Sequence, residues 1–342
     1  MRRRNFIQST ALMTATVGTG LAGILSTNSS VQGQETPTIR LGLDQWLGYL
    51  PWRIAEEKNM FANHGIKGQI TWFPGITEWQ NAFNTNNVDV MCAYTGDVIT
   101  SNIRGVKCKV VAMMNYSNGG DQILAADSIK TIADFKDKEI LVKKGTIYEL
   151  LLLQALDKNG LTPSDVKIVD TPGDVAGVAF GTGKADIVVT GNPGAAKALE
   201  ARKSGRVIFS SSDVPGMIPD LITVHSNFID KNPKVVQGLV DTWFEAVSFH
   251  QKNTEEAYAI EAKFIKVPVD QFKEMIQGIR FLAPPENMQS FDPNDKSLSL
   301  YHYVPIISQF LLENKVIDAG IAKADDVLDG QFVADYFKRN PA

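Results

Sequence analysis

Residues of the kinds that catalyse reactions or bind metals are spread along this chain without the spacing that either chemistry requires. The four histidines lie far apart, at His64, His225, His250 and His302, and there is no HExxH motif and no cluster of cysteine and histidine. A Gly-x-Ser-x-Gly nucleophile motif is also absent, and Ser117 has no histidine near it in the sequence. We therefore expect no metal, no cofactor and no enzymatic activity.

The two cysteines are expected to be buried free thiols. Cys92 ends one apolar run and Cys108 begins another. In neighbouring parallel strands they would lie at opposite ends, too far apart for a disulfide.

The first residues of the chain predict export. Arg3 to Gln8 has the pattern of a twin-arginine signal, an apolar run follows from about Ala11 to Leu25, and Val31 to Gly33 supplies small residues for cleavage. The apolar run is shorter than the roughly 20 residues that span a bilayer. No cysteine follows it, so a lipid anchor is not expected. We expect a periplasmic protein, free or anchored by an uncleaved signal.

Length and charge narrow the class further. After the signal about 310 residues remain, which suggests two lobes rather than one core. The chain has 34 basic and 38 acidic residues, and the signal contains three of the arginines and no acid. The remaining acidic balance argues against nucleic acid or an anionic membrane as partner.

Hydrophobic periodicity predicts alternating strands and helices, as in an α/β protein with parallel sheets. The expected strands are residues 39–43, 69–73, 88–91, 106–114, 140–142, 166–169, 187–189, 207–209 and 221–224. The expected helices are residues 51–59, 76–80 onward, 97–104, 150–156, 174–181, 193–203, 233–251, 255–264, 270–278 and 301–313. Capping boxes are expected at Thr77 with Gln80 and at Thr146 with Glu149.

Several segments, in this order and spacing, make the chain resemble the periplasmic solute-binding proteins of ABC importers, in the nitrate, sulfonate and taurine branch. The matching segments are Trp46 to Pro51, Glu56 to Phe61, His64 to Ile66, Asp89 with Val90, Thr95 to Asp97, Tyr116 to Asp121, Ile129 to Lys136, Lys144 to Thr146 and Asp186 to Val189.

The resemblance implies a two-lobed periplasmic binding protein fold of type II. Each lobe would be a mostly parallel sheet flanked by helices, and two crossing segments, near Asp121 to Ala125 and Ser211 to Leu221, would form the hinge. We expect residues 1–33 to be the signal, residues 34–121 and 221–342 to form lobe 1, and residues 122–220 to form lobe 2. The resemblance also implies a permease and its ATPase as partners, and we expect a monomer.

Ligands of such folds bind in loops at the carboxyl ends of strands. The loops selected in this way contain acids, aromatic residues and two lysines, Lys143 and Lys144, but no arginine. The candidate ligand-binding residues are Trp46, Tyr49, Glu78, Trp79, Thr95, Asp97, Asp121, Thr146, Tyr148 and Asn192.

Acids and aromatic rings without arginine favour a small nitrogen-rich solute, either a guanidinium or amidinium cation or a neutral urea-like amide. Local structural roles compete with this interpretation. Asp97 could stabilise a helix N-terminus that Thr95 caps, Glu149 could complete a capping box, and Glu78 lies in a first helical turn. Free N–H groups at helix N-termini could also bind an anion. The alternative is therefore a sulfonate, taurine or nitrate importer component. An enzyme like the thiamine-pyrimidine synthases is a more distant alternative, because its cysteine-rich motif is absent.

Overall fold

The computed structural model describes residues 36–295, 298–320 and 323–340. The signal segment expected over residues 1–33 lies outside the described residues. Residues 36–342 form one compact unit. In the described part of the chain, no helix has the length and apolar character needed to cross a membrane.

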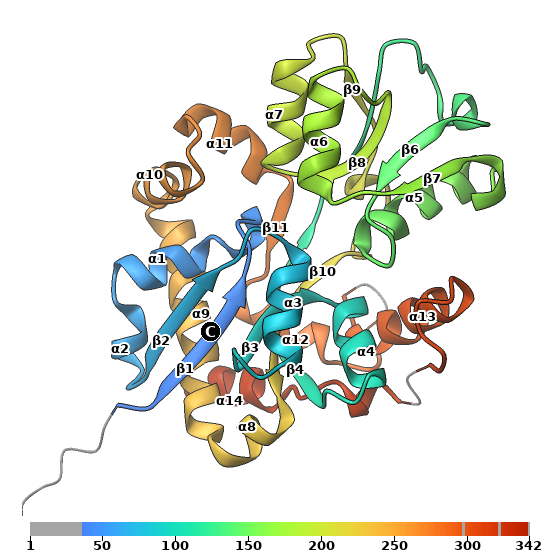
Figure 1. Cartoon of the computed structure of the whole chain (residues 1–342). Coiled ribbons are helices and arrows are strands. Elements are labelled where there is room, and N and C mark those ends of the chain that lie inside the picture. Colours follow the sequence, from blue (N-terminus) through green and yellow to red (C-terminus); the bar gives the residue numbers. More distant parts are fainter. Residues whose placement is uncertain (1–35, 296–297, 321–322, 341–342) are drawn as a thin grey trace, which may run out of the picture. The chain divides into compact units, whose positions relative to one another are not determined.

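Two β-sheets organise the chain (Figure 1). The first sheet has the order β11-β4-β10-β3-β1-β2. Its strands are β1 (Thr38–Leu43), β2 (Lys67–Trp72), β3 (Val90–Tyr94), β4 (Cys108–Ser117), β10 (Pro219–His225) and β11 (Ile279–Phe281). The second sheet has the order β7-β6-β8-β5-β9. Its strands are β5 (Asp121–Ala125), β6 (Glu139–Val142), β7 (Lys167–Asp170), β8 (Ile187–Gly191) and β9 (Arg206–Ser210).

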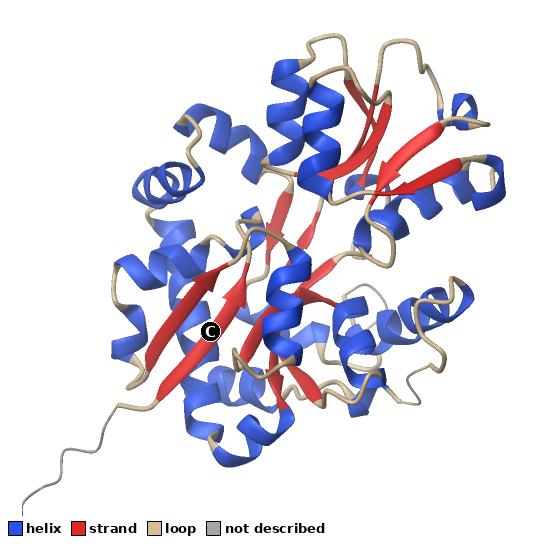
Figure 2. Cartoon of the chain, viewed as in Figure 1, coloured by secondary structure: helices blue, strands red, loops and turns tan. Residues whose placement is uncertain are grey.

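Helices cover both faces of each sheet (Figure 2). The second sheet carries α5 (Ile147–Lys158), α6 (Gly173–Gly181) and α7 (Gly194–Ala201). The remaining helices are α1 (Pro51–Glu57), α2 (Met60–Asn63), α3 (Ile76–Asn84), α4 (Thr95–Ile103), α8 (Ser226–Lys231), α9 (Pro233–Lys252), α10 (Thr254–Ile265), α11 (Val269–Ile276), α12 (Pro284–Ser290), α13 (Leu300–Glu313) and α14 (Gln331–Arg339).

The period of two along the strands decides which residues face which helices. In the second sheet, Ile123 of β5 and Ile187 of β8 pack in one core with α5. Their neighbours Leu124 and Val188 point to the other face and pack with α6 and α7 in a separate cluster. Both faces of the sheet are thereby buried, as in other α/β proteins.

β5 in the second sheet and β10 in the first run antiparallel to both of their neighbours, and each lies where the chain changes sheets; the edge strand β11 is also antiparallel to its neighbour β4. After β4 the chain passes through residues 118–120 and enters β5, which is antiparallel to β8 and β9. After β9 it passes through a short 3-10 turn, Ser211–Asp213, and enters β10, which is antiparallel to β3 and β4. The segment expected only as a crossing, Asp121 to Ala125, is therefore a strand.

Most expected elements are present, with ends shifted by a few residues. β11, α2, α8, α12 and α14 were not expected. The capping box expected at Thr77 is wrong, because α3 begins at Ile76 after the N-cap residue Gly75, which leaves Thr77 inside the helix. The cap at Thr146 is confirmed: its hydroxyl accepts from the Tyr148 N–H of α5.

The cysteines are buried and free, as expected, but the geometric reason was wrong. Cys92 lies in β3 and Cys108 in β4, and these strands are not neighbours because β10 lies between them. Burial is the main cause that raises the pKa of Cys92 well above its usual value and that of Cys108 to about 12, so both thiols stay protonated.

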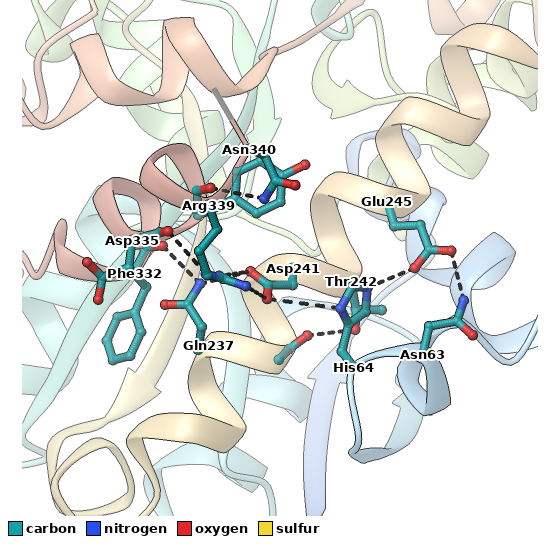
Figure 3. Close-up of polar contacts among 12 residues, drawn as sticks. Asn63, His64, Gln237, Asp241, Thr242, Glu245, Phe332, Asp335, Arg339 and Asn340 are labelled. Carbon is teal, nitrogen blue, oxygen red and sulfur yellow. Dashed lines mark hydrogen bonds and ion pairs between the residues drawn. The ribbon is translucent and has the colours of Figure 1, made fainter. Parts of the chain in front are cut away.

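The last helix is attached to α9 by a charged cluster (Figure 3). Arg339 of α14 donates to both carboxylate oxygens of Asp241, at 2.8 and 2.7 Å. Gln237 donates to Asp241 Oδ1 at 2.8 Å and to the Phe332 carbonyl at 3.1 Å. His64 lies 2.8 Å from Glu245 Oε2, which connects the segment after α2 to α9. The contacts of Arg339 and Gln237 hold α14 against α9, and the contact of His64 holds the segment after α2 against the same helix.

Candidate functional site

A cavity of about 660 Å³ is lined by residues from both sheets. The first sheet contributes the segments that follow β1, β2 and β3, together with the start of β10. The second contributes the start of β5, the segments after β6 and β8, and parts of α6 and α7. The carboxyl ends of parallel strands thus meet the amino ends of the antiparallel strands β5 and β10, which places the cavity where α/β folds bind ligands.

Asp44 follows β1 and is held by two tryptophans. Its Oδ1 accepts from the backbone N–H of Trp46 at 3.0 Å, and its Oδ2 accepts from the indole N–H of Trp79 at 3.2 Å. Burial is the main cause that raises the pKa of Asp44, while these hydrogen bonds act in the opposite direction. The carboxylate is therefore oriented at the cavity wall, and no cationic side chain in the described part of the chain pairs with it.

Asp220 lies at the start of β10 and is buried. Its Oδ2 accepts from the Trp46 indole N–H at 2.6 Å, and its Oδ1 accepts from the Tyr49 hydroxyl at 3.2 Å. Burial raises its pKa well above the usual value, and the nearby charges of Asp121 and Asp44 raise it further. Trp46 therefore connects Asp44 to Asp220, through its backbone N–H and its ring.

Asp97 occupies the first turn of α4. Its Oδ2 accepts from the backbone N–H of Tyr94, the N-cap residue, at 3.3 Å, and its Oδ1 accepts from the Gln80 amide at 3.2 Å. Burial raises its pKa to about 7, with a further contribution from Asp44. The local role considered for Asp97 is thus real, but the same side chain also lines the cavity.

Asp121 begins β5, opposite Gly191 at the end of β8. It is 3% exposed, and its Oδ2 has no hydrogen-bond partner among the described residues. Burial raises its pKa to about 7; the Ser117 hydroxyl opposes this shift and the charge of Asp44 adds to it. A buried carboxylate oxygen without a donor is costly, and a ligand N–H could satisfy it.

The cavity as a whole is acidic. Six carboxylates line it, those of Asp44, Glu78, Asp97, Asp121, Asp174 and Asp220. The cationic side chains among the described lining residues are Lys143 and Lys197. Lys143 pairs with Asp170 at 3.2 Å, and Lys197 is exposed. The buried aspartates therefore have no counter-charge among the residues that the structure describes, and burial and mutual repulsion favour their protonation.

The structure brings eight of the ten expected site residues to this cavity: Trp46, Tyr49, Glu78, Trp79, Asp97, Asp121, Tyr148 and Asn192. Thr95 and Thr146 are not among its lining residues. Thr95 is the first residue of α4 and does not cap it, because the N-cap position belongs to Tyr94. Thr146 caps α5. Glu149 accepts from the Gly145 N–H at 2.7 Å instead of from the Thr146 N–H of the expected capping box. Both side chains therefore stabilise the start of α5.

The sequence interpretation missed Asp220. It read the apolar run after it as a further strand of a mostly parallel sheet, whose amino end would lie far from the ligand. β10 is antiparallel to β3, and the register pairs Asp220 with Tyr94, at the carboxyl end of β3. An acid directly before an apolar run, at the point where the chain returns to its first lobe, is the signal that could have identified it.

No group of three or more His, Cys, Asp and Glu side chains within residues 36–295, 298–320 and 323–340 is arranged to hold a metal ion. The cavity acids are thus held apart by tryptophan and tyrosine donors rather than gathered as ligands.

Two sheets joined by two crossings, with a cavity where they meet, give the chain the two-lobed fold of periplasmic binding proteins. The chain belongs to the NMT1-like family, whose model matches residues 32–265.

Individual relatives agree with this class. A Brucella abortus protein named as a binding protein is 26% identical over 271 residues, which cover 78% of this chain and 80% of the relative. An Escherichia coli protein named as an aliphatic sulfonates-binding protein is 26% identical over 255 residues, or 72% of this chain and 78% of the relative. The crystal structure of the Escherichia coli periplasmic aliphatic sulphonate binding protein SsuA has the same fold, with a TM-score of 0.71, 19% identity, and coverage of 86% of this chain and 92% of that chain. The expected fold class and the expected binding rather than catalytic role are confirmed.

Proposed function

We propose that this protein is the exported capture component of an ABC importer and that its solute carries a guanidinium or amidinium cation. The observation that supports the ligand is the convergence of Asp44, Asp97, Asp121 and Asp220 on one cavity without a buried cationic partner. A cation in the cavity would supply the missing counter-charge and stabilise the ionised carboxylates.

A planar cation with several N–H groups matches the groups that the cavity offers. Asp121 Oδ2 and the Tyr94 hydroxyl are buried and lack hydrogen-bond partners among the described residues. Carboxylate oxygens accept such donors strongly, and Trp46, Trp79 and Tyr148, whose aromatic rings can attract a cation, line the cavity. A neutral urea-like amide would satisfy the same acceptors but would leave the charges uncompensated.

The names of the relatives favour a different solute. Judged by those names alone, a sulfonate fits better than a guanidinium ion. A sulfonate in this cavity would meet protonated aspartates, the two lysines and the N-termini of helices such as α5. The two candidates therefore require opposite protonation states of the same acids, and pH distinguishes them.

Calorimetry of the purified protein with guanidinium chloride, urea, taurine and sodium nitrate, at pH 8 and pH 6, tests the proposal. Guanidinium is expected to bind, and more weakly at pH 6, because Asp97 and Asp121 have pKa values of about 7 and protonation removes the charge that the cation needs. Linkage predicts a loss of roughly tenfold for each carboxylate that must be ionised. Tight binding of taurine or nitrate that strengthens toward pH 6, with no guanidinium binding, would favour the sulfonate-type alternative.

Binding would act through the hinge. Ligand held between the two sheets favours the closed arrangement of the lobes, and the closed form docks on the permease, whose ATPase drives import. The protein itself performs no chemistry in this cycle and works as a monomer.

A further inference from the structure

The cavity is much larger than its acidic part requires. A volume of about 660 Å³ lies within the roughly 300 to 1,000 Å³ typical of pockets that hold drug-sized molecules. A bare guanidinium ion has four heavy atoms and would occupy only the region between the aspartates. The remaining space extends along α6 and α7.

This second region is walled by one face of each helix. The cavity is lined by Gly177 and Gly181 of α6 and by Ala198 and Ala201 of α7, which recur every three or four residues. Such spacing places each pair on a single helical face. The two faces pack directly on each other, since a Cβ atom placed on Gly181 would lie 3.1 Å from the Ala201 Cβ atom. We call the part of the cavity that runs along this helix contact the α6–α7 groove.

Exposed valines extend the apolar wall. Val175 and Val178 of α6 also line the cavity, and their side chains are 51% and 68% exposed. Large apolar side chains exposed next to a cavity are characteristic of ligand-binding surfaces.

The groove begins beside the acids. A Cβ atom placed on Gly177 would lie 3.7 Å from the Thr190 hydroxyl, and one placed on the next residue of β8, Gly191, would lie 3.0 Å from Asp121 Oδ1. The buried, unpartnered Oδ2 of Asp121 belongs to the same cavity. A cation bound to Asp121 would therefore have the apolar groove directly next to it.

We infer that the α6–α7 groove is a second subsite, which accepts an apolar substituent on the bound cation. The solute class is then an alkyl- or aryl-substituted guanidine or amidine rather than the bare ion. This inference rests on the proposed function, since the acids must first hold the cationic group.

Calorimetry at pH 8 with guanidinium, methylguanidinium, n-butylguanidinium and phenylguanidinium tests it. Each methylene buried in the groove is expected to tighten binding about fourfold, so n-butylguanidinium should bind at least tenfold more tightly than guanidinium. The double variant Val175→Thr/Val178→Thr makes the wall polar at constant shape, and Ala201→Phe, at an exposed position, narrows the groove. Both should remove most of the butyl gain and leave the affinity for guanidinium unchanged.

Val207→Thr is the matched control, because Val207 is an exposed valine of β9 that does not line the cavity. It should preserve the full gain. Binding of guanidinium with no gain along the alkyl series, or a gain that survives all groove variants, would overturn the subsite and leave the proposed function intact. Failure of every guanidinium compound to bind would overturn the proposed function and the subsite together.

Discussion

Three aspartates of the cavity, Asp44, Asp97 and Asp220, are held by donors that fix their position without neutralising them. Trp46, Trp79 and Tyr49 donate to Asp44 and Asp220, and Gln80 donates to Asp97. Neutral donors orient a carboxylate but supply little of the charge compensation that burial requires. The donors therefore fix these carboxylates in position without supplying the counter-charge that the proposed cationic ligand would bring.

Asp121→Asn should weaken guanidinium binding at pH 8 by roughly tenfold to a hundredfold, because a hydrogen bond to a charged group contributes about 1.5 to 3 kcal/mol. Calorimetry measures the affinity, and circular dichroism checks the fold. Asp174→Asn is the control: it removes the same charge from an exposed lining residue, where solvent screens it, and should change affinity less than threefold. Equal affinities of Asp121→Asn and the unmodified protein for guanidinium would show that Asp121 does not contribute to binding.

Gly191 lies so close to the site residues that any side chain at this position would collide with them. A Cβ atom there would lie 2.9 Å from the Trp46 ring and 3.1 Å from the Tyr148 hydroxyl. Gly191→Val should thus displace Trp46 from Asp220 and weaken guanidinium binding by tenfold or more. Gly183→Ala is the control. Gly183 lies in the same lobe and has open space around it, but its φ is positive, so the substitution should lower stability without changing the affinity for guanidinium. Unchanged binding by Gly191→Val would show that Trp46 does not need its present position.

At the scale of elements, the antiparallel strands β5 and β10 bring acids to the site. β5 and β10 run opposite to the strands beside them, so each begins where its neighbours end. Asp121, the first residue of β5, and Asp220, the second residue of β10, therefore lie at the cavity. The helices contribute differently, because α4 places Asp97 in its first turn while α5 is capped by a residue outside the cavity.

Thr146→Ala should lower the free energy of unfolding by about 1 kcal/mol, the usual cost of removing a threonine N-cap. Urea denaturation measures this change. Thr146→Ser keeps the hydroxyl and should restore most of the stability. Guanidinium affinity should stay within twofold in both variants, because Thr146 does not line the cavity. A large loss of guanidinium affinity in Thr146→Ala, but not in Thr146→Ser, would show that Thr146 contributes to ligand binding.

At the scale of the whole molecule, the buried acids connect stability to pH. Asp97 and Asp121 have pKa values of about 7 in the folded protein, well above the usual value for aspartate in an unfolded chain. The folded state therefore binds protons more tightly than the unfolded state between about pH 4 and pH 7. This stabilisation is fully present below the unfolded pKa and is lost as pH rises through about 7.

The unliganded protein should accordingly lose about 2 kcal/mol of stability per group between pH 5.5 and pH 8. Asp97→Asn mimics the protonated acid and should reduce this pH dependence by about that amount, as measured by urea denaturation at both pH values. Saturating guanidinium should raise stability most at pH 8. A pH dependence identical in Asp97→Asn and the unmodified protein would show that Asp97 titrates normally.

The sequence alone determined the class of fold and selected eight residues that the structure places at the cavity. The alternation of apolar runs predicted the strands and helices, because it depends on local periodicity. The general rule that α/β folds bind ligands after parallel strands predicted Trp46, Trp79 and Asp97.

The tertiary structure decided what depends on pairing between distant segments. The direction of β10 brings Asp220 to Trp46, the order of the strands separates Cys92 from Cys108, and the packing of α6 against α7 forms the groove. Strand direction and helix packing are set by contacts far apart in sequence, so hydrophobic periodicity alone does not determine them.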